Sequence, residues 1–180
     1  MTFFAHPLDD HAALTLFSVE DAAEFTELTR ANQARLAQWE DWAQGPQEVD
    51  EKREFIRGKL RAFVEGTSVP CFIRVDGAIV GSIELRVERN RNAEIGYWID
   101  VAFEGRGLVR RACEALIDHA FGALGLERLE LYIVAENERS RGLAKRLGFT
   151  DDGTRRSAMD VGDRRFDVVT YGLLRGEWRR

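Results

Sequence analysis

The stretch that most constrains the fold of this chain is residues 94–116, EIGYWIDVAFEGRGLVRRACEAL. It begins with residues 94–101, which are rich in the aromatic and β-branched side chains that favour a half-buried strand. Gly105 and Gly107 follow, and from Leu108 the apolar residues recur at helical spacing. Glycines ahead of a helix leave backbone N–H groups uncovered at the positive end of the helix dipole, where phosphate groups bind. The stretch therefore predicts a strand, a phosphate-binding turn and an amphipathic helix.

Three kinds of phosphate-binding motif compete for these glycines. A P-loop requires Gly-Lys-Ser/Thr, but Gly107 is followed by Leu and Val at positions 108 and 109. A dinucleotide fingerprint requires a third glycine at position 110, and Arg110 is too bulky for close packing of helix on strand. The acidic residue that this fingerprint expects about 20 positions later could be Glu127 or Glu130, so that test alone does not exclude it.

The third motif is the pyrophosphate loop of the GCN5-related N-acetyltransferases (the GNAT family), which reads Gln/Arg-x-x-Gly-x-Gly/Ala after a strand. Residues 104–109, EGRGLV, resemble it. The order of EIGYW, GRG, ENERS and LGF along the chain is similar to the branch that contains the ribosomal-protein N-terminal acetyltransferases. The resemblance covers roughly residues 12–175 and is strongest over 93–150.

Three positions depart from the family pattern. Glu104 replaces Gln/Arg and Val109 replaces Gly/Ala. Because a carboxylate facing phosphates would be repelled, we expect Glu104 to point away from them. Some ribosomal-protein members place a Glu in the C-terminal hairpin, where this chain aligns Met159. That departure puts their catalytic base in doubt here.

The strand pattern also separates the two remaining motifs. Residues 70–75 and 78–87 flank Asp76-Gly77, a dipeptide that suits a two-residue hairpin turn, and a further strand starts near Ala93. Three hairpin-linked strands form an antiparallel meander, which a purely parallel dinucleotide-binding fold would lack. The meander therefore favours the acetyltransferase fold independently of the glycine motif.

The chain of 180 residues is predicted to form one domain, residues 1–180, in the order β-α-α-β-β-β-α-β-α-β-β. The first helix would start at a capping box of Ser18 and Asp21 and run toward Trp39, and the second would span residues 49–64. The resemblance implies an α/β (α+β) fold, with a mixed, mostly antiparallel seven-stranded sheet flanked by about four helices. Two central parallel strands would splay apart to receive the cofactor.

Composition excludes several classes of protein. The net charge of −5 argues against non-specific nucleic-acid binding. No apolar run approaches the roughly 18 residues of a membrane span, and the N-terminus does not resemble a signal peptide. Cys71 and Cys113 are too few for a disulfide framework and have no metal-ligand spacing. The sequence predicts a cytoplasmic protein with no metal site.

The resemblance assigns cofactor contacts to particular residues. Backbone groups of Ile99 and Val101 would contact the pantetheine arm of acetyl-CoA, and Asn137 would reach the pantetheine amide or the acetyl group. The pyrophosphate would lie against Gly105, Arg106, Gly107, Leu108 and Val109, with Arg110 beside it. A basic pair, Arg110-Arg111, in a first helical turn that normally prefers acids makes sense beside phosphates.

The predicted catalytic residues are Ser140 and Asn137, which the same resemblance implies, and Glu94. Many relatives use a Tyr further along the helix that contains Ser140, but here residues 143–146 are LAKR, so Ser140 is the nearest hydroxyl to the thioester sulfur. The alternative is structural: Asn137 caps the helix and Ser140 lies in its first turn.

Glu94 is the first candidate for the base, or for holding the incoming amine through water. Its structural alternative is an exposed strand residue paired with an Arg, and Glu84 and Glu130 are rivals on adjacent strands. Tryptophans could line the acceptor pocket or belong to the core: Trp39, Trp42 and Trp98. The histidines show no ligand spacing and are expected to be structural or exposed: His6, His11 and His119.

These observations predict an acetyl-CoA-dependent N-acetyltransferase that acts by direct transfer in a ternary complex. The acceptor would be a primary amine, either a protein N-terminus or a small molecule, and the family resemblance adds a homodimer, with no nucleic-acid or membrane partner. Three alternatives remain open: a larger acyl-CoA donor such as succinyl-CoA, a non-catalytic acyl-CoA-binding module and, more distantly, a nicotinamide oxidoreductase.

Overall fold

The computed structural model describes residues 5–179, and its framework is one eight-stranded sheet with the strand order β1-β2-β3-β4-β5-β6-β8-β7. The strands are β1 (Ala5–Pro7), β2 (Ala12–Leu16), β3 (Ser68–Val75), β4 (Ala78–Val87), β5 (Asn92–Ile99), β6 (Arg128–Val134), β7 (Thr150–Val161) and β8 (Arg164–Leu174). The α-helices in this part of the chain are α1 (Ala22–Leu36), α2 (Val49–Val64), α3 (Leu108–Phe121) and α4 (Glu138–Arg146). Short 3₁₀ turns are formed by Val19–Asp21, Asp41–Ala43, Arg89–Arg91 and Val101–Phe103.

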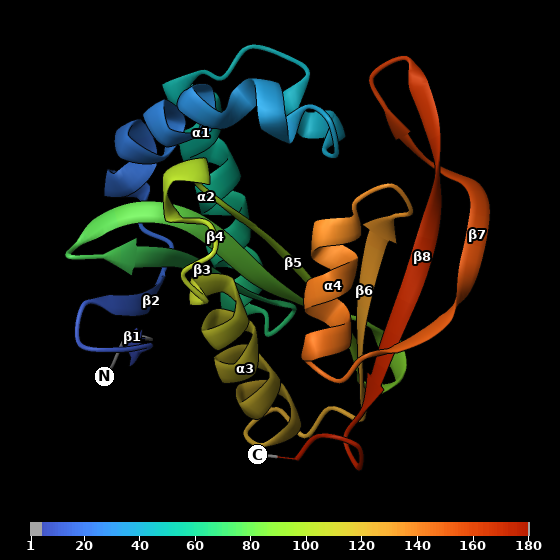
Figure 1. Ribbon diagram of the computed structural model, residues 1–180. Coiled ribbons are helices and arrows are strands. Elements are labelled where there is room, and N and C mark those ends of the chain that lie inside the picture. The colour runs from blue at the N-terminus through green and yellow to red at the C-terminus, as the bar shows by residue number, and fades with distance from the viewer. Residues whose placement is uncertain (1–4, 180) are drawn as a thin grey trace.

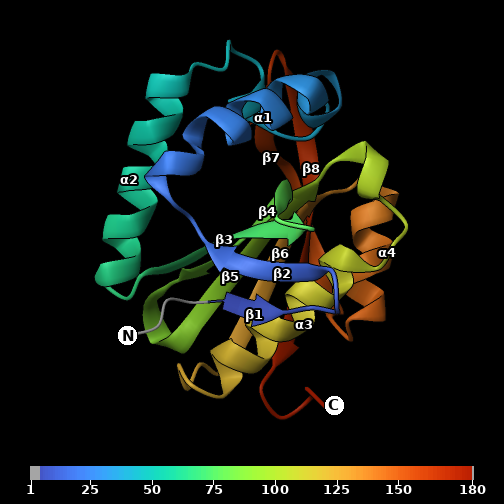
Figure 2. The same ribbon diagram turned by 90° about the vertical axis from the view of Figure 1, so that its left-hand side faces the viewer.

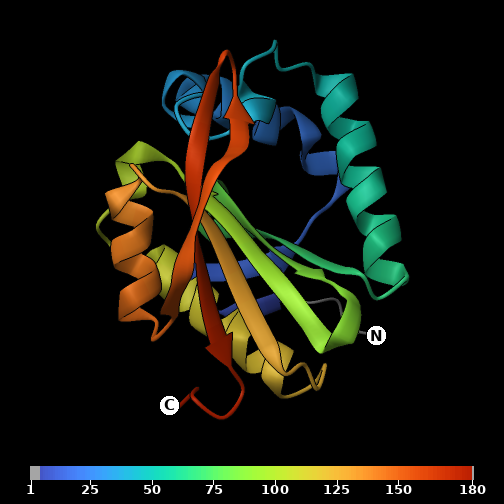
Figure 3. The same ribbon diagram turned by 90° about the vertical axis from the view of Figure 1, so that its right-hand side faces the viewer.

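The helices lie on both faces of the sheet. Figures 2 and 3 show α2 on one side of the strands, and α3 and α4 on the other. A cluster around Phe17, Phe25 and Phe72 fills the space under α1 and α2, with Ile56 of α2 fully buried in it. The larger core packs α3 and α4 on the opposite face, where Leu116 is fully buried.

One strand pair differs from all its neighbours. β5 and β6 run parallel, whereas the other neighbouring strands pair antiparallel. Their pairing covers only Asn92 with Arg128, Ala93 with Leu129 and Glu94 with Glu130, although both strands continue beyond it. Figure 1 shows the two strands diverging from there toward their C-terminal ends. The predicted mixed, mostly antiparallel sheet with splayed parallel strands is confirmed.

The predicted hairpin forms at Asp76-Gly77. Both residues have left-handed φ values, +48° and +86°, as a two-residue turn between twisted strands requires. β3 and β4 pair antiparallel on either side, from Val75 with Ala78 outward. The meander continues into β5, whose Ala93 pairs with Val87.

Three boundary predictions were wrong. The sheet has eight strands rather than seven because the short, exposed β1 adds to its edge, and its sequence, AHP, has no strand pattern. The strand expected over residues 94–101 ends at Ile99, since the side chain of Asp100 accepts a hydrogen bond from the amide of Ala102 (3.1 Å) and starts a 3₁₀ turn.

The capping box at Ser18 is also absent. Ser18 caps no helix with its side chain, and a 3₁₀ turn precedes α1, which ends at Leu36 instead of running on toward Trp39. The amide of Asp21 donates to the carbonyl of Ser18 (3.1 Å), which closes the 3₁₀ turn, and the carboxylate of Asp21 accepts from Arg74 on β3 at 2.6 Å. A backbone turn and a tertiary ion pair thus take the place of the expected capping box.

The remaining composition-based expectations concern cysteines and membranes. Cys71 and Cys113 are both free and buried. Burial raises the pKa of each thiol well above its ordinary value, so both stay protonated and unreactive in the folded protein. Across residues 5–179, no helix is long and apolar enough to cross a membrane.

Candidate functional site

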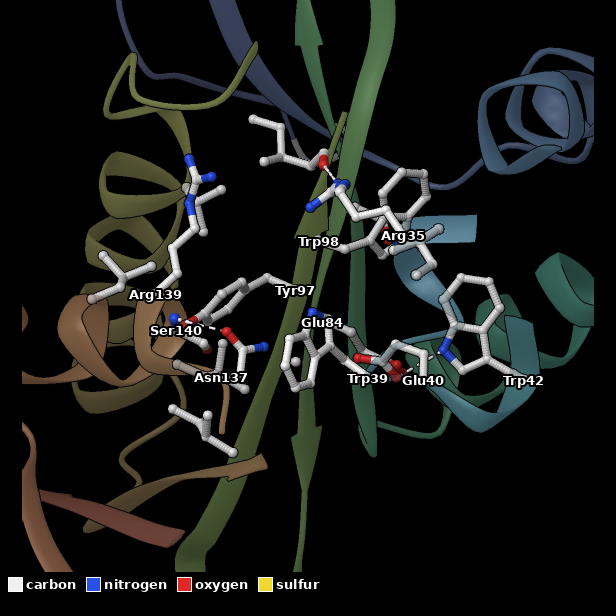
Figure 4. A pocket seen from close by; sticks show the side chains of 18 of the residues that line it. Arg35, Trp39, Glu40, Trp42, Glu84, Tyr97, Trp98, Asn137, Arg139 and Ser140 are labelled. Carbon is white, nitrogen blue, oxygen red and sulfur yellow. Dashed lines mark hydrogen bonds between the residues drawn. The ribbon is translucent and has the colours of Figure 1, made fainter. Parts of the chain in front are cut away.

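A cavity of about 1310 Å³ opens where β5 and β6 separate. On the α3 and α4 face its wall includes Gly107, Asn137 and Ser140, and on the α1 and α2 face it includes Glu94 and Trp98. The alternation of side chains along β5 explains this division: Ile95, Tyr97 and Ile99 pack with the core under α3 and α4, while Trp98 packs with the cluster under α1 and α2. The cavity therefore connects the two faces of the sheet through the splay. Figure 4 shows its lining side chains from close by.

The glycine turn has the backbone that a phosphate cradle needs. Gly105 and Gly107 have φ values of +74° and +73°, in the left-handed region that favours glycine. Gly107 caps the N-terminus of α3 without a side chain, and the first amides of a helix have no partner within it. The backbone N–H groups from Leu108 to Arg110 therefore stay available at the cavity wall.

The basic side chains around this turn are held by the protein itself. Arg106 donates to the carbonyl of Ala102 (2.9 Å) and does not line the cavity. Arg110 lines the cavity and pairs with Glu114 at 2.8 Å. Arg111 pairs with Asp9 at 2.7 Å. Of the predicted basic side chains, Arg110 alone is thus at the cavity wall.

Glu104 is one of the departures from the family pattern, and its negative charge is compensated by arginines on two helices. Its carboxylate accepts from Arg35 on α1 (2.8 Å) and from Arg139 on α4. Two guanidinium groups neutralise the charge that would otherwise face a pyrophosphate. This pairing also ties α1 to α4 beside the cavity.

The backbone groups predicted to contact the pantetheine arm already have partners. The carbonyl of Ile99 accepts from Arg35, and the amide of Val101 donates to Asn32 Oδ1 at 3.2 Å. Val101 lies in the 3₁₀ turn, is 59% exposed, and is not part of the cavity wall. β5 has no strand partner on its β6 side beyond Glu94, so that edge of the strand faces the gap.

Ser140 and Asn137 both lie on the cavity wall at the start of α4. Asn137 is the N-cap, since its Oδ1 accepts from the amide of Ser140 at 3.1 Å. Asn137 therefore has the predicted structural role of helix cap. Ser140, in the first turn of the capped helix, lies at the gap. The hydroxyl of Ser140 is 2.8 Å from that of Tyr97 on β5.

Tyr97 is a site residue that the sequence analysis missed. Burial raises the pKa of its phenol, which keeps the hydroxyl protonated as a hydrogen-bond donor. Many relatives have their Tyr on the helix that corresponds to α4, whereas Tyr97 belongs to the EIGYW strand on the opposite side of the gap. The signal available was the alternation of β5, which places Tyr97 on the same face as Ile95 and Ile99.

We expect Asn137→Ala to lower the free energy of unfolding by about 0.5–2 kcal/mol, because the first turn of α4 loses its side-chain cap. Asn137→Ser keeps a capping oxygen, so its free energy of unfolding should fall by only about a few tenths of a kcal/mol. Urea unfolding followed by circular dichroism measures both. Equal stability of Asn137→Ala and the unaltered protein would show that the cap contributes nothing.

Glu94 is part of an ion-pair network on the other face. Arg86 pairs with Glu94 at 2.5 Å and with Glu84 at 3.2 Å, and Lys59 pairs with Glu84 at 2.7 Å. The predicted alternative, pairing with a neighbouring Arg, is thus observed for Glu94. Of its two rivals, Glu84 lines the cavity, and Glu130 does not; Arg128 and Tyr132 donate to the carboxylate of Glu130 instead.

The three predicted tryptophans all line the cavity. Trp98 stacks on Phe25 with ring centroids 5.9 Å apart, and lies 6.4 Å from Trp42. Trp39 packs with Met159 in a small apolar cluster that includes the β7–β8 hairpin. Each tryptophan therefore combines packing with a place at the wall. The histidines do not line this cavity: His6, His11 and His119.

A second residue that the sequence did not reveal is Glu40. It lies just before the 3₁₀ turn Asp41–Ala43, lines the cavity, and accepts a hydrogen bond from Trp42 Nε1 at 2.9 Å. Burial raises the pKa of its carboxyl group. An isolated Glu between helices carries no motif, so only its neighbours in space mark it.

Comparisons with known proteins agree with this geometry. A family model described as an acetyltransferase (GNAT) domain matches residues 12–150. The chain is 35% identical over 178 residues to the Bacillus subtilis (strain 168) protein named "Putative ribosomal N-acetyltransferase YdaF", with 97% of each chain covered. It is 30% identical over 145 residues to the "Ribosomal-protein-serine acetyltransferase" of Escherichia coli (strain K12), with 79% of this chain and 81% of that one covered.

A solved structure gives the same picture of the fold. "Mycobacterium smegmatis RimJ in complex with CoA-disulfide" superposes with a TM-score of 0.88 at 26% identity, covering 94% of this chain and 84% of that one. The sheet with one parted parallel pair, the glycine-capped helix beside the gap and the family match over most of the length all agree. This chain is an N-acetyltransferase of the GNAT family.

Proposed function

We propose that the protein transfers the acetyl group of acetyl-CoA directly to a primary amine while both are bound, and that the amine is a protein N-terminus, with small amines as the second class. The observation that carries the proposal is the cavity through the splayed sheet. Its walls lie on both faces of the sheet, so that an acyl donor bound on one face and an amine bound on the other would meet at the gap. The names of two relatives support a ribosomal protein as the acceptor and hence a cytoplasmic enzyme.

Holding both reactants together supplies much of the catalysis. Orientation of two bound reactants removes roughly 7–11 kcal/mol of barrier, and one donor to the developing oxyanion supplies about 2.7–4 kcal/mol. The cradle of Gly105 to Val109 would hold the pyrophosphate by its amides, with Arg106 contributing its backbone only and Arg110 its side chain. The pantetheine arm would run along the free edge of β5 toward Ile99 and Val101, on the opposite side of the gap from Asn137.

Ser140 is proposed as the hydrogen-bond donor to the departing thiolate. Tyr97 can donate to the oxygen of Ser140, which leaves the proton of Ser140 directed at the sulfur. Glu94 lines the acceptor side, but Arg86 neutralises its charge. We therefore propose that Glu94 contributes through its pair with Arg86 and contacts the incoming amine only through water.

Ser140→Ala should lower kcat about 10- to 100-fold, at or below the lower end of general-acid help, because a thiolate leaves readily. Affinity for acetyl-CoA, measured by calorimetry, should stay within about twofold, since the cradle is untouched. Tyr97→Phe, which keeps the Ser140 hydroxyl, should have the smaller effect. An unchanged kcat in Ser140→Ala would remove Ser140 from the reaction.

The test of the function itself is thiol release from acetyl-CoA across a panel of amines. Peptides that begin with Ser or Ala should be acetylated faster than spermidine or an aminoglycoside. Mass spectrometry should find one added acetyl group at the peptide α-amine. Thiol release with succinyl-CoA but not acetyl-CoA would favour a larger donor, and silence with every amine would favour an acyl-CoA-binding module.

A further inference from the structure

Glu40 is held rigidly at the wall of the acceptor side of the cavity. Its amide donates to the carbonyl of Leu36 (2.9 Å), and its carbonyl accepts from Ala43 (3.2 Å). Trp42 Nε1 donates to Oε2, which leaves the second carboxylate oxygen free of this bond. Figure 4 shows this bond on the side of the cavity opposite Asn137 and Ser140. A carboxylate fixed at both its backbone and one oxygen has a defined direction.

Of the other acidic groups at this wall, those on β4 and β5 are already paired, and Glu51 on α2 is exposed to solvent. Glu94 and Glu84 share Arg86, and Glu84 also holds Lys59. Glu40 forms no ion pair with any residue of the described chain, 5–179. A carboxylate without a counterion is the better acceptor for a cationic amine, because its charge is not neutralised.

The residues next to Glu40 in sequence contact the β7–β8 hairpin. Trp39, the preceding residue, packs on the same apolar cluster as Met159 on β7, the position where an acid would otherwise be expected. The amide of Gly162, in the turn of the same hairpin, donates to Asp41 at 3.0 Å. The hairpin and the segment after α1 therefore meet, and Glu40 lies beside this closed end of the cavity.

We propose that Glu40 is the group that accepts the proton of the incoming ammonium, and so acts as the general base of the acetyl transfer. The inference rests on the proposed function, because it requires an amine acceptor. It assigns the base to the segment between α1 and α2, and gives Glu94 the task of holding Arg86 in place.

The proton balance is simple. The ammonium R–NH₃⁺ gives one proton to the Glu40 carboxylate, and the neutral amine attacks the thioester carbonyl to form the new N–C bond. As the C–S bond breaks, the nitrogen loses its second proton and the sulfur gains one, with Ser140 as hydrogen-bond donor. Protonated Glu40 then releases its proton to solvent, so that amide, free CoA thiol and one proton are the products.

The pKa of Glu40 is shifted in the direction that a general base requires. Burial is the main cause that raises its pKa, Glu94 on β5 raises it further, and Arg86 on β4 and the Trp42 hydrogen bond lower it. A raised pKa makes the carboxylate a stronger base. The rate should therefore rise with pH through the pKa of Glu40.

The decisive variant is Glu40→Gln, whose amide oxygen can still accept from Trp42. With the peptide of the panel that gives the highest rate, kcat at pH 7 should fall roughly 10²- to 10⁴-fold. Affinity for acetyl-CoA should stay within about twofold. The peptide α-amine has a pKa of about 7.7–8.0, so its neutral fraction rises about six- to tenfold between pH 7 and pH 9, and the defect should shrink by about that factor.

Two further measurements separate this role from a structural one. Glu54→Gln removes an exposed carboxylate that pairs with Arg57 on α2, away from the cavity, and should leave kcat unchanged. Without any amine, the fluorescence of Trp42 should titrate with Glu40. That titration should be lost in both Glu40→Gln and Trp42→Phe.

Each outcome decides the inference. An active enzyme whose kcat is unchanged by Glu40→Gln, or whose defect is the same at pH 7 and pH 9, overturns the role of Glu40 and leaves the proposed function intact. Failure of the unaltered enzyme to release thiol with every amine overturns the proposed function and the base together. A fluorescence titration that persists in Glu40→Gln shows that another group is titrating and contradicts the placement.

Discussion

Gly107→Val will reduce the affinity for acetyl-CoA at least about 100-fold, which corresponds to about 2.7 kcal/mol. Gly107 has a φ of +73°, and a β-branched residue adopts that conformation only with strain of roughly 1–2 kcal/mol or more. A Cβ at this position would also lie 3.0 Å from Arg111 Nη1. The added methyl groups would cover the amides at the start of α3. The turn must therefore either rearrange or lose its cradle.

The matched control is Gly66→Val. Gly66 has nearly the same backbone, with a φ of +74°, but lies in the turn after α2 with open space around it. It should lose stability through the same backbone strain and keep its affinity for acetyl-CoA. Calorimetry gives the affinities, and thermal unfolding compares the stabilities. Unaltered affinity in a folded Gly107→Val protein would show that the phosphates bind elsewhere.

Phe72→Ala will lower the free energy of unfolding by about 3–5 kcal/mol, the cost of a large cavity in a core. The Phe72 side chain on β3 is fully buried. It stacks on Phe17 with ring centroids 4.2 Å apart and meets the ring of Phe25 edge-on at 4.9 Å. Phe17 and Phe25 in turn line the cavity, so the substitution also removes support from the acceptor wall.

Urea unfolding measures this loss, with Phe55→Ala as the control. Phe55 is 45% exposed, so truncation there should cost roughly 1 kcal/mol or less. Phe72→Leu is the second variant should the alanine form not fold, and should lose a smaller amount. A loss for Phe72→Ala as small as that for Phe55→Ala would mean that the aromatic cluster is not the core under α1 and α2.

The sequence predicted elements best where the signal is local. The Asp76-Gly77 turn depends only on the φ values of two adjacent residues, and the helix over 49–64 was predicted with the bounds that the structure has. The prediction failed where a distant partner decides. A 3₁₀ turn forms where a capping box at Ser18 was expected, and Asp21 pairs with Arg74 from β3.

The residues of the site show the same contrast between local and distant determinants. Ser140 and Asn137 were predicted from the family resemblance of one contiguous stretch, and their proposed roles are compatible with the N-cap that the structure has. Tyr97 and Glu40 were missed because each joins the cavity from another part of the chain. Tyr97 meets Ser140 only across the gap between β5 and α4, and Glu40 faces Arg86 and Glu94 only after α1 packs on the sheet.

The sequence alone determined the hairpin, the glycine-capped start of α3 and the amide-lined turn before it, because each depends on backbone preferences of a few consecutive residues. Only the tertiary structure decided where β5 and β6 part, and that Glu84 and Glu94 receive counterions at the cavity wall while Glu40 has none among residues 5–179. Those outcomes depend on burial and on charges brought together from distant segments. No local pattern contains that information, since the field at one side chain is set by all its neighbours in space.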